Sequence, residues 1–114
     1  TSSANNTAIG PTVLQVLTSG TDNTFCGALS GVLVTTGSNN SVYGSGSGVA
    51  ITTGASNTIY GSTSGNIIST ANGNTIIGAA SNLSADVANC IVVGNGITGA
   101  LGAKAFCSVS IVRQ

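Results

Sequence analysis

The sequence carries almost no charge. Of its 114 residues only Asp22, Asp86, Lys104 and Arg113 are charged at neutral pH, and the net charge is zero. The chain therefore lacks the basic residues with which nucleic-acid-binding proteins displace counterions from phosphates, and we expect no nucleic-acid partner. Low charge together with 41% apolar residues also argues against intrinsic disorder, which requires high charge and few apolar groups.

Side chains on which many enzymes depend are also missing. There is no histidine, methionine or tryptophan, and histidine is the usual acid or base near neutral pH. The only two carboxylates, Asp22 and Asp86, occupy unrelated places in the sequence pattern. No nucleophile–base pair can be assigned, nor any cluster of zinc ligands. We therefore expect a non-enzymatic protein with no catalytic residue, no cofactor and no metal.

The three cysteines, Cys26, Cys90 and Cys107, are too few and too unevenly spaced for a closed disulfide framework. We expect Cys26 to be a small packed hydrophobic side chain, and the sequence leaves open whether Cys90 and Cys107 pair. No apolar run reaches the ~18 residues of a membrane span, and the first residues do not resemble a signal peptide. We expect no membrane insertion.

What the sequence does have is a repeat of seventeen residues. A unit Asn-Thr/Ser-x-x-Gly ends in glycine at positions 10, 27, 44, 61 and 78, and a sixth copy, Cys90-Ile-Val-Val-Gly94, comes one residue early without its asparagine. A second unit lies between these copies at 17–20, 34–37, 51–54 and 68–71. Both units are rich in β-branched residues, and Gly, Ser and Asn separate them, which is typical of strands and turns.

Two strands and two turns per repeat predict an all-β fold, a parallel β-solenoid with about seventeen residues per coil over residues 1–94. Coils would stack at the inter-strand distance of about 4.8 Å, and each would bury its apolar side on its neighbours. Residues 95–114 leave the repeat, and we expect an irregular closing segment with one strand through Cys107, Val109 and Ile111.

Equivalent positions of successive coils should form rows. The asparagines predict a structural ladder whose amides bond along the solenoid axis, consisting of Asn6, Asn23, Asn40, Asn57 and Asn74. The glycine that ends each unit fits a corner that needs positive φ or a close backbone approach.

Each first strand carries two apolar side chains in succession. One row is Ala8, Phe25, Val42, Ile59 and Ile76, and the next is Ile9, Cys26, Tyr43, Tyr60 and Ile77. Adjacent strand residues point to opposite sides, and a thin coil has one interior, so we expect the second row to be exposed. Exposed apolar stripes mark association surfaces, and we expect this row to join protomers in a closed homotrimer. The alternative is a wider monomeric coil whose interior takes in both rows.

Several stretches resemble the head repeats of trimeric autotransporter adhesins of the YadA type and related viral and phage fibre repeats. They are "NNTAIG" at 5–10, "TTGSNNSVYG" at 35–44, "TTGASNTIYG" at 52–61 and the tail from Asn89 to Ile111. The resemblance implies a trimeric β-roll at a cell or virion surface that contacts a host receptor or glycan. The chain departs from that family in its longer repeat, and it has no neck motif or coiled-coil heptads.

The main alternative is ice binding by a monomer. Small β-solenoids rich in Thr, Ser and Asn are a recurrent antifreeze design, and some plant ice-binding proteins have repeats similar to these. Thr18, Thr35 and Thr52 form one partial row, and Thr7, Thr24, Thr58 and Thr75 form another. The second row is paired with tyrosine and isoleucine, which interrupt a regular grid of small hydroxylated residues. A purely structural spacer is a third possibility.

Overall fold

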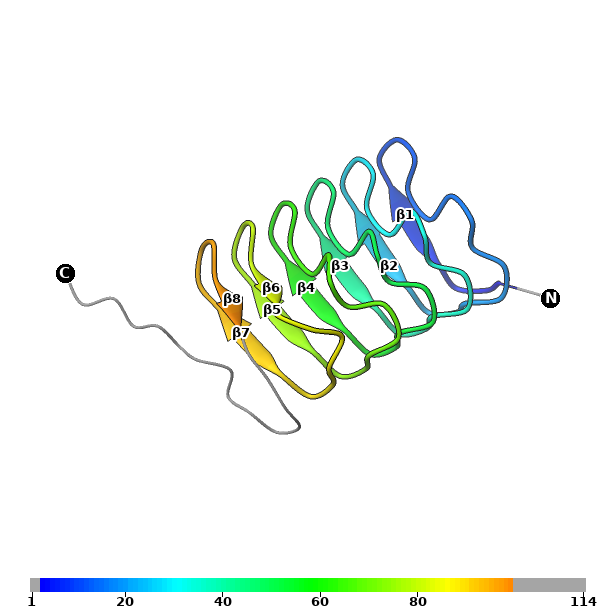
Figure 1. Cartoon of the computed structure of the whole chain (residues 1–114). Coiled ribbons are helices and arrows are strands. Elements are labelled where there is room, and N and C mark those ends of the chain that lie inside the picture. Colours follow the sequence, from blue (N-terminus) through cyan, green and yellow to red (C-terminus); the bar gives the residue numbers. More distant parts are fainter. Residues whose placement is uncertain (1–2, 100–114) are drawn as a thin grey trace.

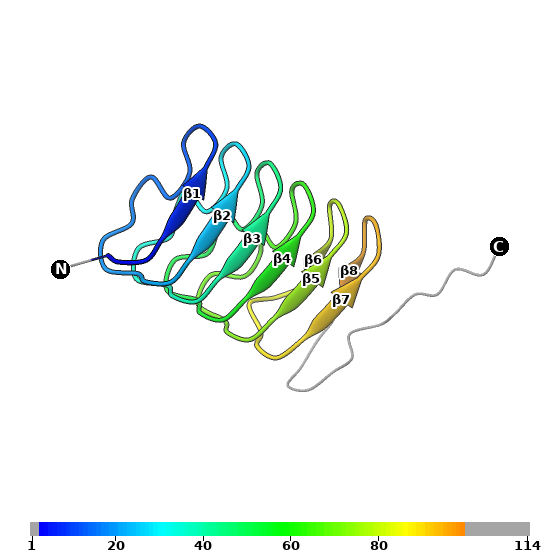
Figure 2. The same ribbon diagram turned by 180° about the vertical axis from the view of Figure 1, so that it is seen from behind.

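The computed structural model describes residues 3–99, which form a parallel β-solenoid with about seventeen residues per coil (Figures 1 and 2). The chain winds repeatedly around one axis, and each coil lies against the one before it. The fold prediction is confirmed. The expected closing strand through Cys107, Val109 and Ile111 lies outside the described residues, as does Cys107 itself.

One wall of the solenoid is a six-stranded parallel sheet in the order β1-β2-β3-β4-β5-β7. Its strands are β1 (Thr7–Ile9), β2 (Thr24–Cys26), β3 (Ser41–Tyr43), β4 (Thr58–Tyr60), β5 (Thr75–Ile77) and β7 (Ile91–Val93). A second sheet pairs β6 (Asn82–Leu83) with β8 (Thr98–Gly99), so part of the expected closing segment joins the solenoid.

The register of the main sheet follows the sequence repeat. Thr7 lies opposite Thr24, and each later strand is offset by seventeen residues until Thr75, which lies opposite Ile91 after only sixteen. The missing residue does not disturb the strand faces, because Ile76 still lies opposite Val92. A one-residue slip within a strand would have turned every side chain to the other face, so the deletion is confined to a turn.

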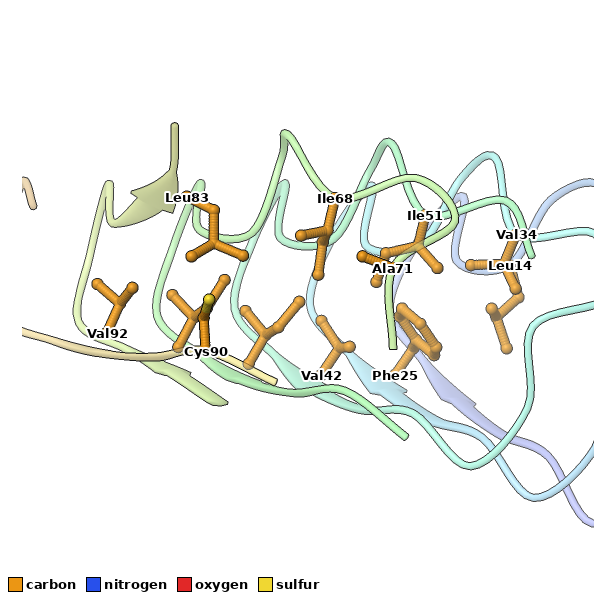
Figure 3. Close-up of a cluster of buried hydrophobic side chains, with 12 residues drawn as sticks. Leu14, Phe25, Val34, Val42, Ile51, Ile68, Ala71, Leu83, Cys90 and Val92 are labelled. Carbon is orange, nitrogen blue, oxygen red and sulfur yellow. The ribbon is translucent and has the colours of Figure 1, made fainter. Parts of the chain in front are cut away.

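Two facing rows of side chains fill the coil. The central residue of each strand points inward, and Phe25, Val42, Ile59, Ile76 and Val92 are fully buried. The opposite side contributes a second buried row, Val34, Ile51, Ile68 and Leu83. Figure 3 shows the two rows pointing toward each other, with Phe25 and Val42 facing Val34 and Ile51. The coil is therefore flattened, with two walls on opposite sides of one thin core.

The second repeat unit does not form the predicted strand. In its place three successive N–H groups, those of Thr35, Thr36 and Gly37, donate to the one carbonyl oxygen of Thr52 in the next coil. A strand ladder needs successive N–H groups to point in opposite directions, so this convergence excludes regular strand geometry. The segment still bonds from coil to coil, and it forms the wall opposite the main sheet.

Candidate interaction surface

The outward side of the main sheet, here called the sheet face, consists of two parallel rows. Each strand has three residues, so its first and third side chains point away from the core. The first residues form a hydroxyl row of Thr7, Thr24, Ser41, Thr58 and Thr75, and Ile91 replaces it in the last strand. The third residues form an apolar row of Ile9, Cys26, Tyr43, Tyr60, Ile77 and Val93.

The apolar row is accessible to solvent along the whole sheet. Tyr60 is 59% exposed, Ile9 58% and Ile77 42%, so the wider coil that would enclose both rows is wrong. The rings of Tyr43 and Tyr60 stack with their centroids 5.1 Å apart, which gives the row a rigid aromatic centre. Cys26 lies in this outward row and is half-buried.

The hydroxyl row has no partners within the described chain. None of its five hydroxyl groups, counted over residues 3–99, makes a hydrogen bond to another protein group. They are held at the spacing of the strands on a flat surface, and each keeps a donor proton and acceptor lone pairs for an outside partner.

The opposite wall exposes a second pair of rows, here called the wall face. Its apolar members are Val16, Leu33, Ala50 and Ile67, and its hydroxyl members are Thr18, Thr35, Thr52 and Ser69. Here the hydroxyls are engaged: Thr18 Oγ1 donates to the carbonyl of Thr35 at 3.0 Å, and Thr35 Oγ1 donates to that of Thr52 at 3.2 Å. The two faces thus carry the same residue types with different hydrogen-bonding capacity.

A buried asparagine ladder fixes the edge of the sheet from which the hydroxyl row starts. In each step the Oδ1 of one asparagine accepts from the backbone N–H of the next, as between Asn40 and Asn57 at 3.0 Å. The Nδ2 of Asn57 also donates to the Ala71 carbonyl, which closes its own coil at 3.0 Å. The Oδ1 contact stacks Asn6, Asn23, Asn40, Asn57 and Asn74, and Cys90 N–H completes the last step. The Nδ2 of Asn74 is buried without a partner among the described residues.

A second internal ladder was missed in the sequence. Ser30, Ser47, Ser64 and Ser81 are fully buried at one corner of successive coils. Ser47 Oγ donates to the Gly44 carbonyl at 2.6 Å, and Ser64 and Ser81 bond the carbonyls of Gly78 and Gly94. Their spacing of seventeen was the available signal, but serine is so frequent in the turns that the buried members do not stand out.

Asp86 terminates the wall face. Its carboxylate accepts hydrogen bonds from the backbone N–H groups of Ser69, Thr70 and Ala71, taking the place that the Ser69 carbonyl occupies one coil earlier, where it accepts from Thr52 and Gly54. Burial raises the pKa of this carboxyl, but the hydrogen bonds from Thr70, Ser69 and Ala71 outweigh it and leave the pKa below its usual value. The side-chain carboxylate thus caps three N–H groups that a backbone carbonyl bonds in the preceding coils.

Nothing in the described part of the chain has the geometry of a reaction centre. Residues 3–99 contain no group of three or more potential metal ligands, and no pocket indents their surface. The same residues contain no helix long and apolar enough to cross a membrane. The segment "GSGSG" at 44–48 is a turn with φ of +138° at Gly44 and +62° at Gly46.

Comparison with known proteins gives no relative: no family model, no curated protein and no solved structure matches the chain.

Proposed function

We propose that the protein is a non-enzymatic structural or adhesive element of a surface fibre, whose copies associate through the sheet face. The observation that carries the proposal is the apolar row, which stays in register across all six strands of the sheet and is exposed in all of them except at the half-buried Cys26. Contiguous exposed apolar surface of this kind marks an interaction site in soluble proteins.

Three properties of the sheet face suit association of copies. It is uncharged, so identical copies meet without repulsion. The hydrogen-bonded asparagine ladder holds it in one shape, which lowers the entropic cost of ordering it on binding. Its rows run along the solenoid axis, so copies that align their axes make the same contact at every coil. We expect a homotrimer at a cell or virion surface, with a receptor or glycan as its further partner.

The absolute mass in solution tests this proposal. Light scattering on a size-exclusion column should give about 33 kDa, three times the 10.9 kDa of one chain. Tyr60→Asp places a charge in the middle of the apolar row and should shift the mass to that of one chain. Ala79→Asp adds the same charge in the exposed turn after Gly78, away from both rows, and should leave the oligomer intact. A wild-type protein that stays at 10.9 kDa at every concentration overturns the proposal.

Ice binding by the monomer is the second candidate, and the unpartnered hydroxyl row favours it. Hydroxyls that bond no protein group are available to order water at the spacing of the strands. Thermal hysteresis of the freezing point measures this activity. Replacing Thr24 and Thr58 by valine should remove the activity, whereas replacing Thr35 and Thr52, whose hydroxyls are already engaged, should leave it unchanged. A wild-type protein without thermal hysteresis excludes this function.

A further inference from the structure

We propose that the sheet face of one copy packs against the wall face of the next copy, coil against coil, so that the interface is head-to-tail between two different surfaces. This inference rests on the proposed self-association and specifies which surfaces meet. The same two faces would then be used by every copy in the assembly.

The sheet face by itself is small for a protein interface. Three residues per strand span about 10 Å, and six strands at about 4.8 Å span about 29 Å, a planar footprint of about 300 Å². Stable interfaces bury about 800 Å² per partner. A chain that uses both of its apolar faces buries about 600 Å², twice the area of the sheet face alone, divided between two contacts. Two different patches let each copy contact two neighbours, whereas identical patches pair off as dimers, and three copies close into a ring only if each contact also rotates the next copy by a third of a turn.

In two of the coils the side chains of the two faces are complementary in size, whereas in a third Tyr60 and Ile67 are both large. Cys26, the smallest member of the sheet row, belongs to the same coil as the large Leu33 of the wall row. In the next coil the large Tyr43 is matched with Ala50, the smallest member of the wall row. Copies aligned at the same height would place large against small at both levels, which is the condition for close packing.

The order of the rows agrees with this alignment. Each strand of the sheet runs from its hydroxyl residue to its apolar residue, as from Thr24 to Cys26, whereas the wall runs from Leu33 to Thr35. A chain that winds around one axis runs in opposite directions along opposite walls of each coil (Figure 1). The two apolar rows therefore lie toward the same side, and stacking one copy on the next brings apolar row onto apolar row.

In this arrangement the two hydroxyl rows meet, and their hydrogen-bond donors and acceptors are complementary. The sheet hydroxyls have unused donor protons, and the wall hydroxyls have given their protons to carbonyls but retain acceptor lone pairs. Burying the sheet face against a purely apolar surface would leave five hydroxyls without partners at a considerable cost. Sheet against wall avoids that cost, because a donor row faces an acceptor row.

A mixing experiment with two blocked variants of the full chain tests the pairing. Tyr60→Asp blocks the sheet face and leaves the wall face intact, and Leu33→Asp does the reverse. Both side chains are exposed, at 59% and 47%, so the fold should be retained, which circular dichroism checks. Each variant alone should run as one 10.9 kDa chain. At high concentration an equimolar mixture should form a one-to-one complex of about 22 kDa, twice that mass, because the two intact faces meet and neither introduced charge lies between them. The complex has a single contact, so it should dissociate at a higher concentration than the wild-type assembly does.

The result also separates this inference from the proposed function. If the wild type assembles but Leu33→Asp assembles equally well, sheet faces pair with each other and the inference is overturned. The same conclusion follows if the wild type assembles and the mixture stays at the mass of one chain. A monomeric wild type overturns both proposals together. Ile67→Asp is a second block of the wall face, 48% exposed before substitution, and should reproduce the behaviour of Leu33→Asp.

Discussion

At the scale of single residues, the corners of the coil decide which positions tolerate a side chain. The residue before each ladder asparagine has a left-handed backbone with φ near 60°, and asparagine, aspartate, serine or glycine occupies it, as at Asn39 and Ser56. These residues tolerate that conformation, or compensate for it, better than most L-amino acids. The glycine that follows each strand is different. Its φ lies between 125° and 150°, a backbone conformation that only glycine adopts without strain.

Gly44 and Gly46 lie in the same turn and both have positive φ, but only Gly44 lacks room for a Cβ. Comparing them shows how much of the cost of a substitution comes from steric overlap and how much from backbone strain. A Cβ on Gly44 would lie 2.5 Å from the carbonyl oxygen of Gly61 in the next coil, whereas one on Gly46 has no neighbour closer than 3.7 Å. Leu29 and Thr63 occupy the position of Gly46 in adjacent coils. We expect Gly44→Ala to lower the free energy of unfolding by about 3 kcal/mol or more. The matched Gly46→Ala should change it by about 1 kcal/mol or less.

Urea denaturation followed by circular dichroism measures both variants. Equal losses at the two positions would show that backbone strain alone, rather than the close approach of the next coil, makes the corner glycine necessary.

At the scale of elements, the short strands depend on the asparagine ladder. A three-residue strand supplies few hydrogen bonds, and its neighbours in the coil are turns. The ladder adds bonds along the axis and across the coil at the same residue, as Asn57 does toward Asn40 and Ala71. Because these groups are fully buried, each broken bond leaves a polar atom without water to replace its partner.

Replacing ladder members at the centre and at the end should therefore have unequal effects. Asn57→Ala leaves the N–H of Asn74 and the carbonyl of Ala71 without their partners inside the molecule. We expect a loss of about 3 kcal/mol or more in the free energy of unfolding. Asn6→Ala removes the equivalent bonds at the partly buried first coil, where water can replace them, and should cost about 1 kcal/mol. Thermal or urea unfolding of both variants measures the difference, and equal losses would contradict the ladder's dependence on burial.

At the scale of the whole molecule, the scarcity of charge makes stability nearly independent of pH around neutrality. The chain has no histidine, the side chain whose ordinary pKa lies between pH 5 and 8. The Asp86 cap is the exception at low pH, because hydrogen bonds lower its pKa in the folded state. Its contribution is fully present above the unfolded pKa of about 3.9 and is lost as the pH falls through the lower folded value.

We therefore expect a flat stability profile from about pH 5 to pH 7 and a decline below about pH 4. Asp86→Asn should lower stability by about 1 kcal/mol at pH 7, a small value because the cap is largely exposed. The variant and the wild type should converge as the pH approaches 2. Urea unfolding across this range measures both profiles, and parallel curves without convergence would show that the carboxylate is not the titrating cap.

Much of the fold could be predicted from the sequence because a solenoid repeats its local chemistry. Every coil has the same asparagine, glycine and alternating apolar positions, so the coil length, the parallel register and the outward direction of the Tyr43 row follow from spacing alone. The prediction for the second repeat unit was wrong. Its β-branched residues predict a strand, whereas the N–H groups of Thr35, Thr36 and Gly37 all donate to one carbonyl oxygen. Residue composition does not distinguish a strand from a bend whose backbone also hydrogen-bonds to the next coil, but without the ladder of a β-sheet.

The sequence by itself determined that the chain stacks identical coils and that one apolar row remains outside a thin interior. Only the tertiary structure decided that the coil is flattened with a second exposed row on its opposite wall. It also decided that Thr18 and Thr35 use their hydroxyls internally while Thr24 and Thr58 do not. The reason is physical: periodicity assigns a residue to a side, but a hydrogen bond depends on the backbone of the neighbouring coil, which only the packed structure supplies.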